Sequence, residues 1–186
     1  LLFINKMDKE NVKFNEVVDE IHEKLSKNAT LFALEIGTTN NFKGYAKVLE
    51  KKAVLVDGSV TDVPADLNDE IESIYAEMTE KAAETSEELM EKYFEEGELS
   101  LEDLSVGLQS SVASCDLYPI ILGSGLKNVG VNALLDMVVD LIPSPQPKAG
   151  KDANNQDVTR AVSENEPLGA YVFKTIIDPF VGSISF

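Results

Sequence analysis

The first eight residues place an apolar run directly before a polar one, and this junction constrains the fold most. Leu1-Leu2-Phe3-Ile4 is fully apolar, as is typical of a parallel strand that is buried on both faces. Asn5-Lys6-Met7-Asp8 follows at once, so its polar side chains stand at the carboxyl end of that strand. Because open α/β sheets bind ligands at the carboxyl ends of their strands, we expect an α/β fold with a ligand site here.

Strand-like and helical stretches alternate along the rest of the chain. A second apolar strand ends in the loop Gly123-Ser124-Gly125, and an apolar helix follows that loop. Between the two apolar strands we expect a self-contained α+β insertion. The strand-like stretches are 31–36, 45–56, 60–63 and 117–122, and the helical ones are 12–26, 65–114 and 131–142. Thr85 and Ser100, each three residues before an acidic residue, are predicted helix N-caps.

The chain changes character after Pro145. The stretch 148–166 is polar and lacks periodicity, so we expect a linker or an exposed loop. Two apolar runs, Ala170 to Ile177 and Val181 to Phe186, then flank Asp178-Pro179 and predict strands of a new β-rich unit. Since nothing precedes the first strand to pair with it and the last unit is short, we expect the chain to be part of a longer protein.

Acidic residues dominate the charge of the chain. Asp and Glu number 33 against 16 Lys and Arg, for a formal net charge of -17. This balance argues against a direct grip on nucleic acid and favours basic protein partners. Residues 65–103 hold fifteen acidic residues against two lysines, and the usual interpretation of such a run is a solvated helical face. No apolar run approaches the roughly 20 residues of a membrane span, so we expect no membrane contact and a cytoplasmic protein.

The polar residues after the two apolar strands have the chemistry to select guanine. An ionised Asp8 only accepts hydrogen bonds, so it can take hydrogens from both N1–H and the exocyclic amine of guanine. Lys6 would lay its aliphatic stem on the purine or sugar, and Asn5 would tie the loops together. The amide of Gly125, in the loop that also carries Ser124, would donate to guanine O6. The alternative is an ordinary exposed polar loop, since short motifs also arise by chance.

Four segments, in the same order, resemble elongation factor G, a translational GTPase. They are Ile4-Asn5-Lys6-Met7-Asp8, Ser86-Glu87-Glu88-Leu89-Met90-Glu91-Lys92-Tyr93, Gly123-Ser124-Gly125-Leu126-Lys127-Asn128, and Phe173-Lys174 with Asp178-Pro179-Phe180-Val181-Gly182. The resemblance implies the C-terminal half of a P-loop GTPase domain with an α+β insertion, followed by the start of a β-barrel domain. The implied boundaries are 1–36 and 117–147 for the GTPase domain, 37–116 for the insertion, 148–168 for a linker and 169–186 for the barrel.

The resemblance also implies ligands and partners. Asn5, Lys6 and Asp8 match the guanine-specificity motif, and Ser124 with Gly125 matches the second loop that contacts the base. GTP or GDP would be the ligand, with Mg²⁺ held by residues outside this chain. The ribosome would be the partner during tRNA–mRNA translocation, and acidic side chains of the insertion would dock on its stalk protein. The candidate docking residues are Glu77, Glu80, Glu84, Glu87, Glu88 and Glu91.

Two departures from the family pattern and two missing motifs keep alternatives open. Gly125 stands where the family usually has alanine, and it keeps the amide hydrogen. Lys47 stands where the family usually has an acidic residue, which suggests a divergent paralogue. A ribosomal-protection factor that shares the same domains is a further alternative. The chain has no G-x-x-x-x-G-K-[ST] loop and no Asp-x-x-Gly switch, so we expect no catalytic residue here and no activity from this chain alone. An alternative of another class is an acidic protein-interaction module that binds no nucleotide.

Overall fold

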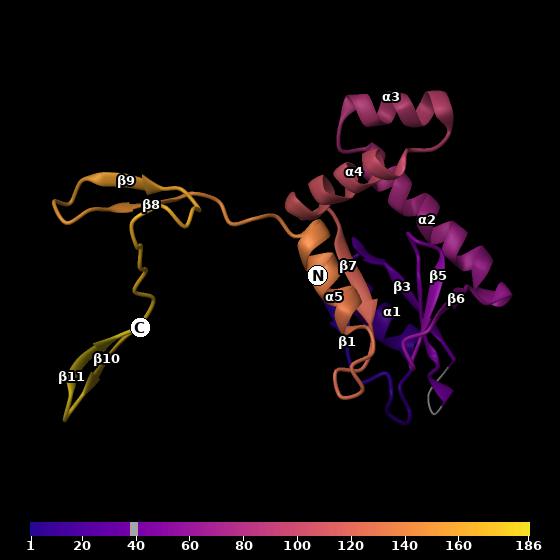
Figure 1. Ribbon diagram of the computed structural model, residues 1–186, viewed down its shortest axis with the longest axis horizontal. Coiled ribbons are helices and arrows are strands. Elements are labelled where there is room, and N and C mark those ends of the chain that lie inside the picture. The colour runs from indigo at the N-terminus through magenta and orange to yellow at the C-terminus, as the bar shows by residue number, and fades with distance from the viewer. Residues whose placement is uncertain (38–40) are drawn as a thin grey trace. The chain divides into compact units, whose positions relative to one another are not determined.

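The computed structural model describes residues 1–37 and 41–186 (Figure 1). They divide into two compact units, Leu1–Pro143 and Ser144–Phe186, and each is described by itself. The strands of the first unit are β1 (Leu2–Ile4), β2 (Ala29–Leu31), β3 (Ala33–Ile36), β4 (Gly44–Lys47), β5 (Lys52–Leu55), β6 (Val60–Asp62) and β7 (Tyr118–Leu122). Its helices are α1 (Phe14–Lys24), α2 (Asn68–Ala83), α3 (Glu87–Glu96), α4 (Leu101–Ala113) and α5 (Val131–Leu141).

The first sheet is parallel and has the order β1-β7-β2 (Figure 1). Its central strand is almost fully buried, with Ile120, Ile121 and Leu122 each at most 2% exposed. Burial on both faces explains why apolar runs without alternation form these strands. Together with the helices that flank it, this sheet confirms the expected α/β fold.

The second sheet is antiparallel and has the order β3-β4-β5-β6. Phe32 joins it to the first sheet, because its amide donates to Ile120 of β7 at 2.8 Å and its carbonyl accepts from Val48 at 3.0 Å. The predicted single strand over 31–36 is therefore wrong: the chain bends at Phe32 and passes from the parallel to the antiparallel sheet. This change of sheet comes four residues before the expected end of the first GTPase segment at residue 36.

The predicted strand over 45–56 is also two strands. β4 and β5 are joined by a tight turn in which Lys51 has a positive φ of 50°, and they pair antiparallel from Gly44 to Lys47. The sequence hides this turn because it contains neither glycine nor proline. The next turn, predicted at Asp57-Gly58, joins β5 to β6 as expected, with Gly58 at a φ of 85°.

Helices α2 and α4 pack closely against each other, and α3 lies across one end of the pair (Figure 1). Gly107 of α4 allows the close approach, because a Cβ at this position would lie 2.7 Å from Ala82 of α2. The predicted N-cap at Ser100 is confirmed, since its hydroxyl accepts from the Asp103 amide at 3.1 Å. The predicted N-cap at Thr85 is wrong by one residue: the cap is Ser86, which accepts from the Leu89 amide.

The second unit contains two exposed antiparallel hairpins. One pairs β8 (Lys148–Lys151) with β9 (Asp157–Arg160), and the other pairs β10 (Thr175–Asp178) with β11 (Gly182–Ser185). The expected linker over 148–168 thus holds a hairpin, which the sequence does not show because its strands are polar and lie in solvent. In residues 1–37 and 41–186, no helix combines the length and hydrophobicity needed to cross a bilayer.

Candidate functional site

Two loops leave the parallel sheet at the same edge. β1 and β7 run side by side with Ile4 opposite Leu122, so the residues after Ile4 and after Leu122 emerge together. Backbone hydrogen bonds continue the pairing past the strands: Gly123 donates to the Ile4 carbonyl at 3.0 Å, and Met7 donates to the Gly123 carbonyl at 3.0 Å. Met7 is only 1% exposed and anchors the first loop in the core.

The Asn5 side chain connects the two loops directly. Its Oδ1 accepts from the Gly125 amide at 2.9 Å and from the Lys6 amide at 2.7 Å. The tying role expected for Asn5 is therefore present. The Gly125 amide, expected to donate to guanine O6, donates to Asn5 instead, so contact with a base would require this N–H to be shared between two acceptors.

The second loop is closed on itself. Ser124 is fully buried, and its backbone forms a reciprocal pair with Val129, at 2.9 Å from the Ser124 amide and 3.0 Å from the Val129 amide. Its hydroxyl accepts from the Lys127 amide at 3.2 Å. A Cβ on Gly123 would lie 2.1 Å from the Val129 carbonyl oxygen, so this glycine is required for the closure. The loop is thus held closed by its own hydrogen bonds.

The Asp8 carboxylate has an unpaired buried oxygen. Among the residues that the structure describes, no donor forms a hydrogen bond with Oδ1 of Asp8, although that atom is buried. The Ser124 side chain, the Asp8 backbone amide and the charges of Lys127 and Lys9 lower the pKa of Asp8, and together they outweigh the opposing effect of burial. Asp8 is therefore an ionised acceptor. A buried acceptor without a partner costs free energy.

Lys6 occupies a left-handed backbone conformation with a φ of 67°, and the residue is exposed. Its predicted contact with the purine or sugar stays a prediction. Sequence reasoning missed three contributors to the site: Met7 as the anchor, Val129 as the partner of Ser124, and Lys127 as the neighbouring charge. Lys127 lies inside the segment 123–128 that carries the family resemblance, and its positive charge could have indicated an effect on Asp8.

The six glutamates proposed for docking lie apart from these loops, along α2 and α3 and the turn between them. All six are exposed. Glu77 pairs with Lys81 at 2.6 Å and Glu88 with Lys92 at 3.2 Å. In the part of the chain that the structure describes, no cation lies within ion-pair distance of the other four, which are Glu80, Glu84, Glu87 and Glu91.

Residues 1–144 match the family of the elongation factor Tu GTP binding domain. The chain belongs to this family. As the name of the family states, such domains bind GTP. The two loops at the edge of the parallel sheet are the candidate site for the guanine base.

The fold also resembles a solved structure, that of the protein ttk003000868 from Thermus thermophilus. The TM-score is 0.73 at 24% sequence identity, over 100% of this chain and 26% of that one. The likeness establishes the fold. This chain spans about a quarter of the length of that protein.

Proposed function

We propose that this chain supplies the guanine-selecting half of a nucleotide pocket in a ribosome-dependent GTPase similar to elongation factor G. The observation that carries the proposal is that the loop holding the ionised Asp8 and the loop that follows β7 meet at one end of the sheet, joined by the hydrogen bond from the Gly125 amide to Asn5. Guanine presents two adjacent donors to such a carboxylate, and adenine does not. A site built on hydrogen bonds of this kind rejects the wrong base by a factor on the order of 10⁴.

The proposed roles of the pocket residues follow from their positions. Asp8 accepts from guanine, Asn5 holds the two loops at a fixed spacing, and Lys6 covers the purine or sugar. Ser124 lowers the pKa of Asp8, and Gly125 shares its amide between Asn5 and guanine O6. The residues that bind the phosphates and Mg²⁺, and those that catalyse hydrolysis, belong to the rest of the proposed protein. This chain alone should therefore bind GDP weakly and hydrolyse no GTP.

The proposed cellular role is GTP-driven translocation of tRNA and mRNA in the cytoplasm. A ribosomal-protection factor or another paralogue of elongation factor G is the alternative within the family. The full-length protein should hydrolyse GTP slowly alone and much faster with ribosomes, and it should advance a pre-translocation complex by one codon. ATP serves as the matched substrate control. Stimulation by ribosomes without codon movement would support the paralogue, and no stimulation would refute ribosome dependence.

We further propose that the exposed glutamates of α2 and α3 dock on the ribosomal stalk. Side chains without a lysine partner are the most effective in attracting a basic surface, and Glu87 and Glu91 lie one turn apart on α3. The double variant Glu87→Lys/Glu91→Lys should slow stalk-dependent GTP hydrolysis by about tenfold at low salt, and less at high salt.

Asp19 and Glu23 on α1 provide a matched control for this experiment. They have the same spacing and are also exposed, so Asp19→Lys/Glu23→Lys makes the same change in charge on another helix. This control should keep the wild-type rate. Equal rates for both double variants, at every salt concentration, would show that the acidic face of α3 does not contact the stalk.

A further inference from the structure

A cavity of about 170 Å³ lies where the second sheet, α4 and α5 meet, and neither proposed loop lines it. Its interior is apolar. The residues that form most of this interior are Phe32, Leu104, Leu108, Ile121, Met137 and Leu141. Leu108 and Ile121 have no exposed surface or almost none, so the floor of the cavity is part of the folded core.

The mouth of the cavity carries charged side chains. Asp136 and Asp140 line it from α5, one turn apart, and in residues 1–37 and 41–186 neither forms an ion pair. Lys47, from β4, is paired with Glu50 at 2.8 Å. The ammonium of Lys47 is thus already neutralised by Glu50, and the two aspartates leave a net negative mouth above an apolar interior.

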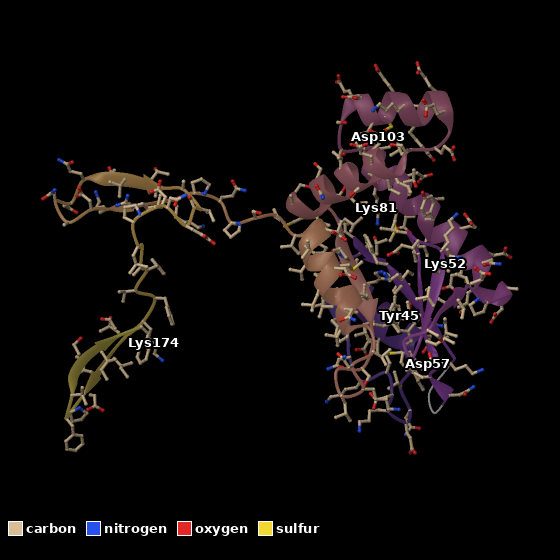
Figure 2. All side chains as sticks on the ribbon, in the orientation of Figure 1. Tyr45, Lys52, Asp57, Lys81, Asp103 and Lys174 are labelled. Atoms are coloured by element: carbon tan, nitrogen blue, oxygen red, sulfur yellow. The ribbon has the colours of Figure 1, made fainter. Side chains whose placement is uncertain are left out.

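Lys47 is also one of the two positions where the sequence departs from the pattern of the family it resembles. Burial lowers the pKa of Lys47, but the hydrogen bond to Glu50 and the nearby negative charges, Asp136 among them, raise it by more than burial lowers it. The Lys47 side chain therefore stays protonated. Tyr45, at the same wall, is 4% exposed, and burial raises its pKa, so it stays neutral (Figure 2). Only Asp136 and Asp140 therefore offer uncompensated charge to a ligand.

Size and charge together define the ligand. Apolar cavities of about 150 Å³ bind benzene, so an aromatic ring fits the volume found here. The two carboxylates at the mouth favour a ligand whose aromatic ring carries a cationic substituent. We propose that this cavity binds a small organic cation in which a short chain joins a phenyl-sized apolar group to an ammonium. Such a ligand would hold α5 against α4 and the second sheet.

The probe for this proposal is 2-phenylethylammonium, titrated into the full-length protein and followed by ligand-observed NMR and calorimetry. For a ligand of this size we expect a dissociation constant of about 1 mM. Phenylacetate, which has a similar ring and the opposite charge, should bind at least tenfold more weakly. Equal binding of the two probes, or no saturable binding of the cation, would overturn the proposal.

Two variants locate the binding. Asp136→Asn/Asp140→Asn removes the charge at the mouth and should weaken binding of the cation at least fivefold. Ala133→Leu, at a residue that lines the cavity, should fill part of it and abolish binding. Asp19→Asn on α1 is the control and should bind as the wild type does. If the aspartate pair can be replaced without loss of affinity, the cation binds elsewhere and the assignment is wrong.

Discussion

The backbone amide of Gly125 donates a hydrogen bond of 2.9 Å to the side-chain oxygen of Asn5, which lies 120 positions earlier in the sequence. This bond joins the loop after β1 to the loop after β7. The second sheet and helices α1 to α4 lie between the two residues in the chain. The geometry of the proposed guanine pocket therefore depends on the folding of the whole first unit.

Removing the Asn5 side chain should weaken nucleotide binding without a change in base preference. Asn5→Ala deletes the bonds from the Gly125 and Lys6 amides. Only the first joins the two loops, and the loss of one such bond corresponds to about 1 kcal/mol, or roughly fivefold in GDP affinity. Fluorescent GDP titration of the full-length protein measures this. Asn15→Ala, an exposed asparagine on α1, is the control. Unchanged GDP affinity in Asn5→Ala would mean that the loop spacing does not depend on this bond.

Two glycines in the second loop should respond oppositely to alanine. A Cβ on Gly125 would meet its nearest neighbour, Asn5 Oδ1, at an ordinary 3.6 Å, and its φ is not positive. Gly125→Ala should therefore stabilise the protein by about 0.4–1 kcal/mol, because it restricts the unfolded chain. Gly123→Ala would place its Cβ 2.1 Å from Val129 and should destabilise by about 1–3 kcal/mol. Urea unfolding distinguishes these, and a less stable Gly125→Ala would contradict the loop geometry.

The Lys92–Asp103 ion pair, at 2.9 Å, should make the junction of α3 and α4 pH-dependent (Figure 2). Hydrogen bonds from Lys92 and Ser100 lower the pKa of Asp103 below 3.8, so its contribution is lost as the pH falls through that lowered value. Hydrogen bonds to Asp103 and Glu88 raise the pKa of Lys92 above 10.5, so its contribution is lost as the pH rises through that value.

Thermal unfolding of Asp103→Asn should show this dependence. The difference in Tm from the wild type should be largest between about pH 5 and pH 9 and should shrink toward both extremes. Glu102→Gln, in the same helical turn and exposed, is the control and should show no such profile. A Tm difference that stays constant from about pH 3 to about pH 11 would show that the pair contributes nothing through its charges.

Ser124 should set the ionisation of Asp8. Its side chain is the largest influence that lowers the pKa of Asp8, so Ser124→Ala should raise that pKa toward its ordinary value. An NMR titration of the Asp8 carboxyl carbon measures the change, with Ser110→Ala on α4 as the control. If the Asp8 titration is the same in both variants, Ser124 does not contribute to the lowered pKa of Asp8.

The sequence predicted the elements whose burial leaves a clear pattern. Tyr118–Leu122 is an apolar run because it is the central strand of a parallel sheet, and the apolar Leu2–Ile4 pairs with it as an edge strand. The polar residues after these strands mark the proposed ligand-binding end of the sheet. The bend at Phe32 leaves no comparable pattern, because the apolar run continues from Leu31 through Leu34 and only the hydrogen-bond partners change. The turn at Lys51 cannot be seen in the sequence since it lacks the usual turn residues.

The site could be predicted as a set of residues and not as a network. Asn5, Asp8 and Ser124 all follow from the sequence, but the sequence does not show that the Gly125 amide bonds to Asn5. That bond depends on the register of β1 against β7, which is a property of the folded sheet. The cavity beneath Lys47 is also invisible in the sequence, because it arises where a sheet and two helices meet.

The most direct test is the base preference of the full-length protein before and after Asp8→Asn. The wild type should bind GDP far more tightly than xanthosine diphosphate. The asparagine amide offers a donor in place of an acceptor, so the variant should lose GDP affinity and gain affinity for xanthosine diphosphate, whose ring has a carbonyl where guanine has its amine. Asp19→Asn should keep the wild-type preference. An Asp8→Asn protein that still binds GDP as tightly as the wild type would contradict the account.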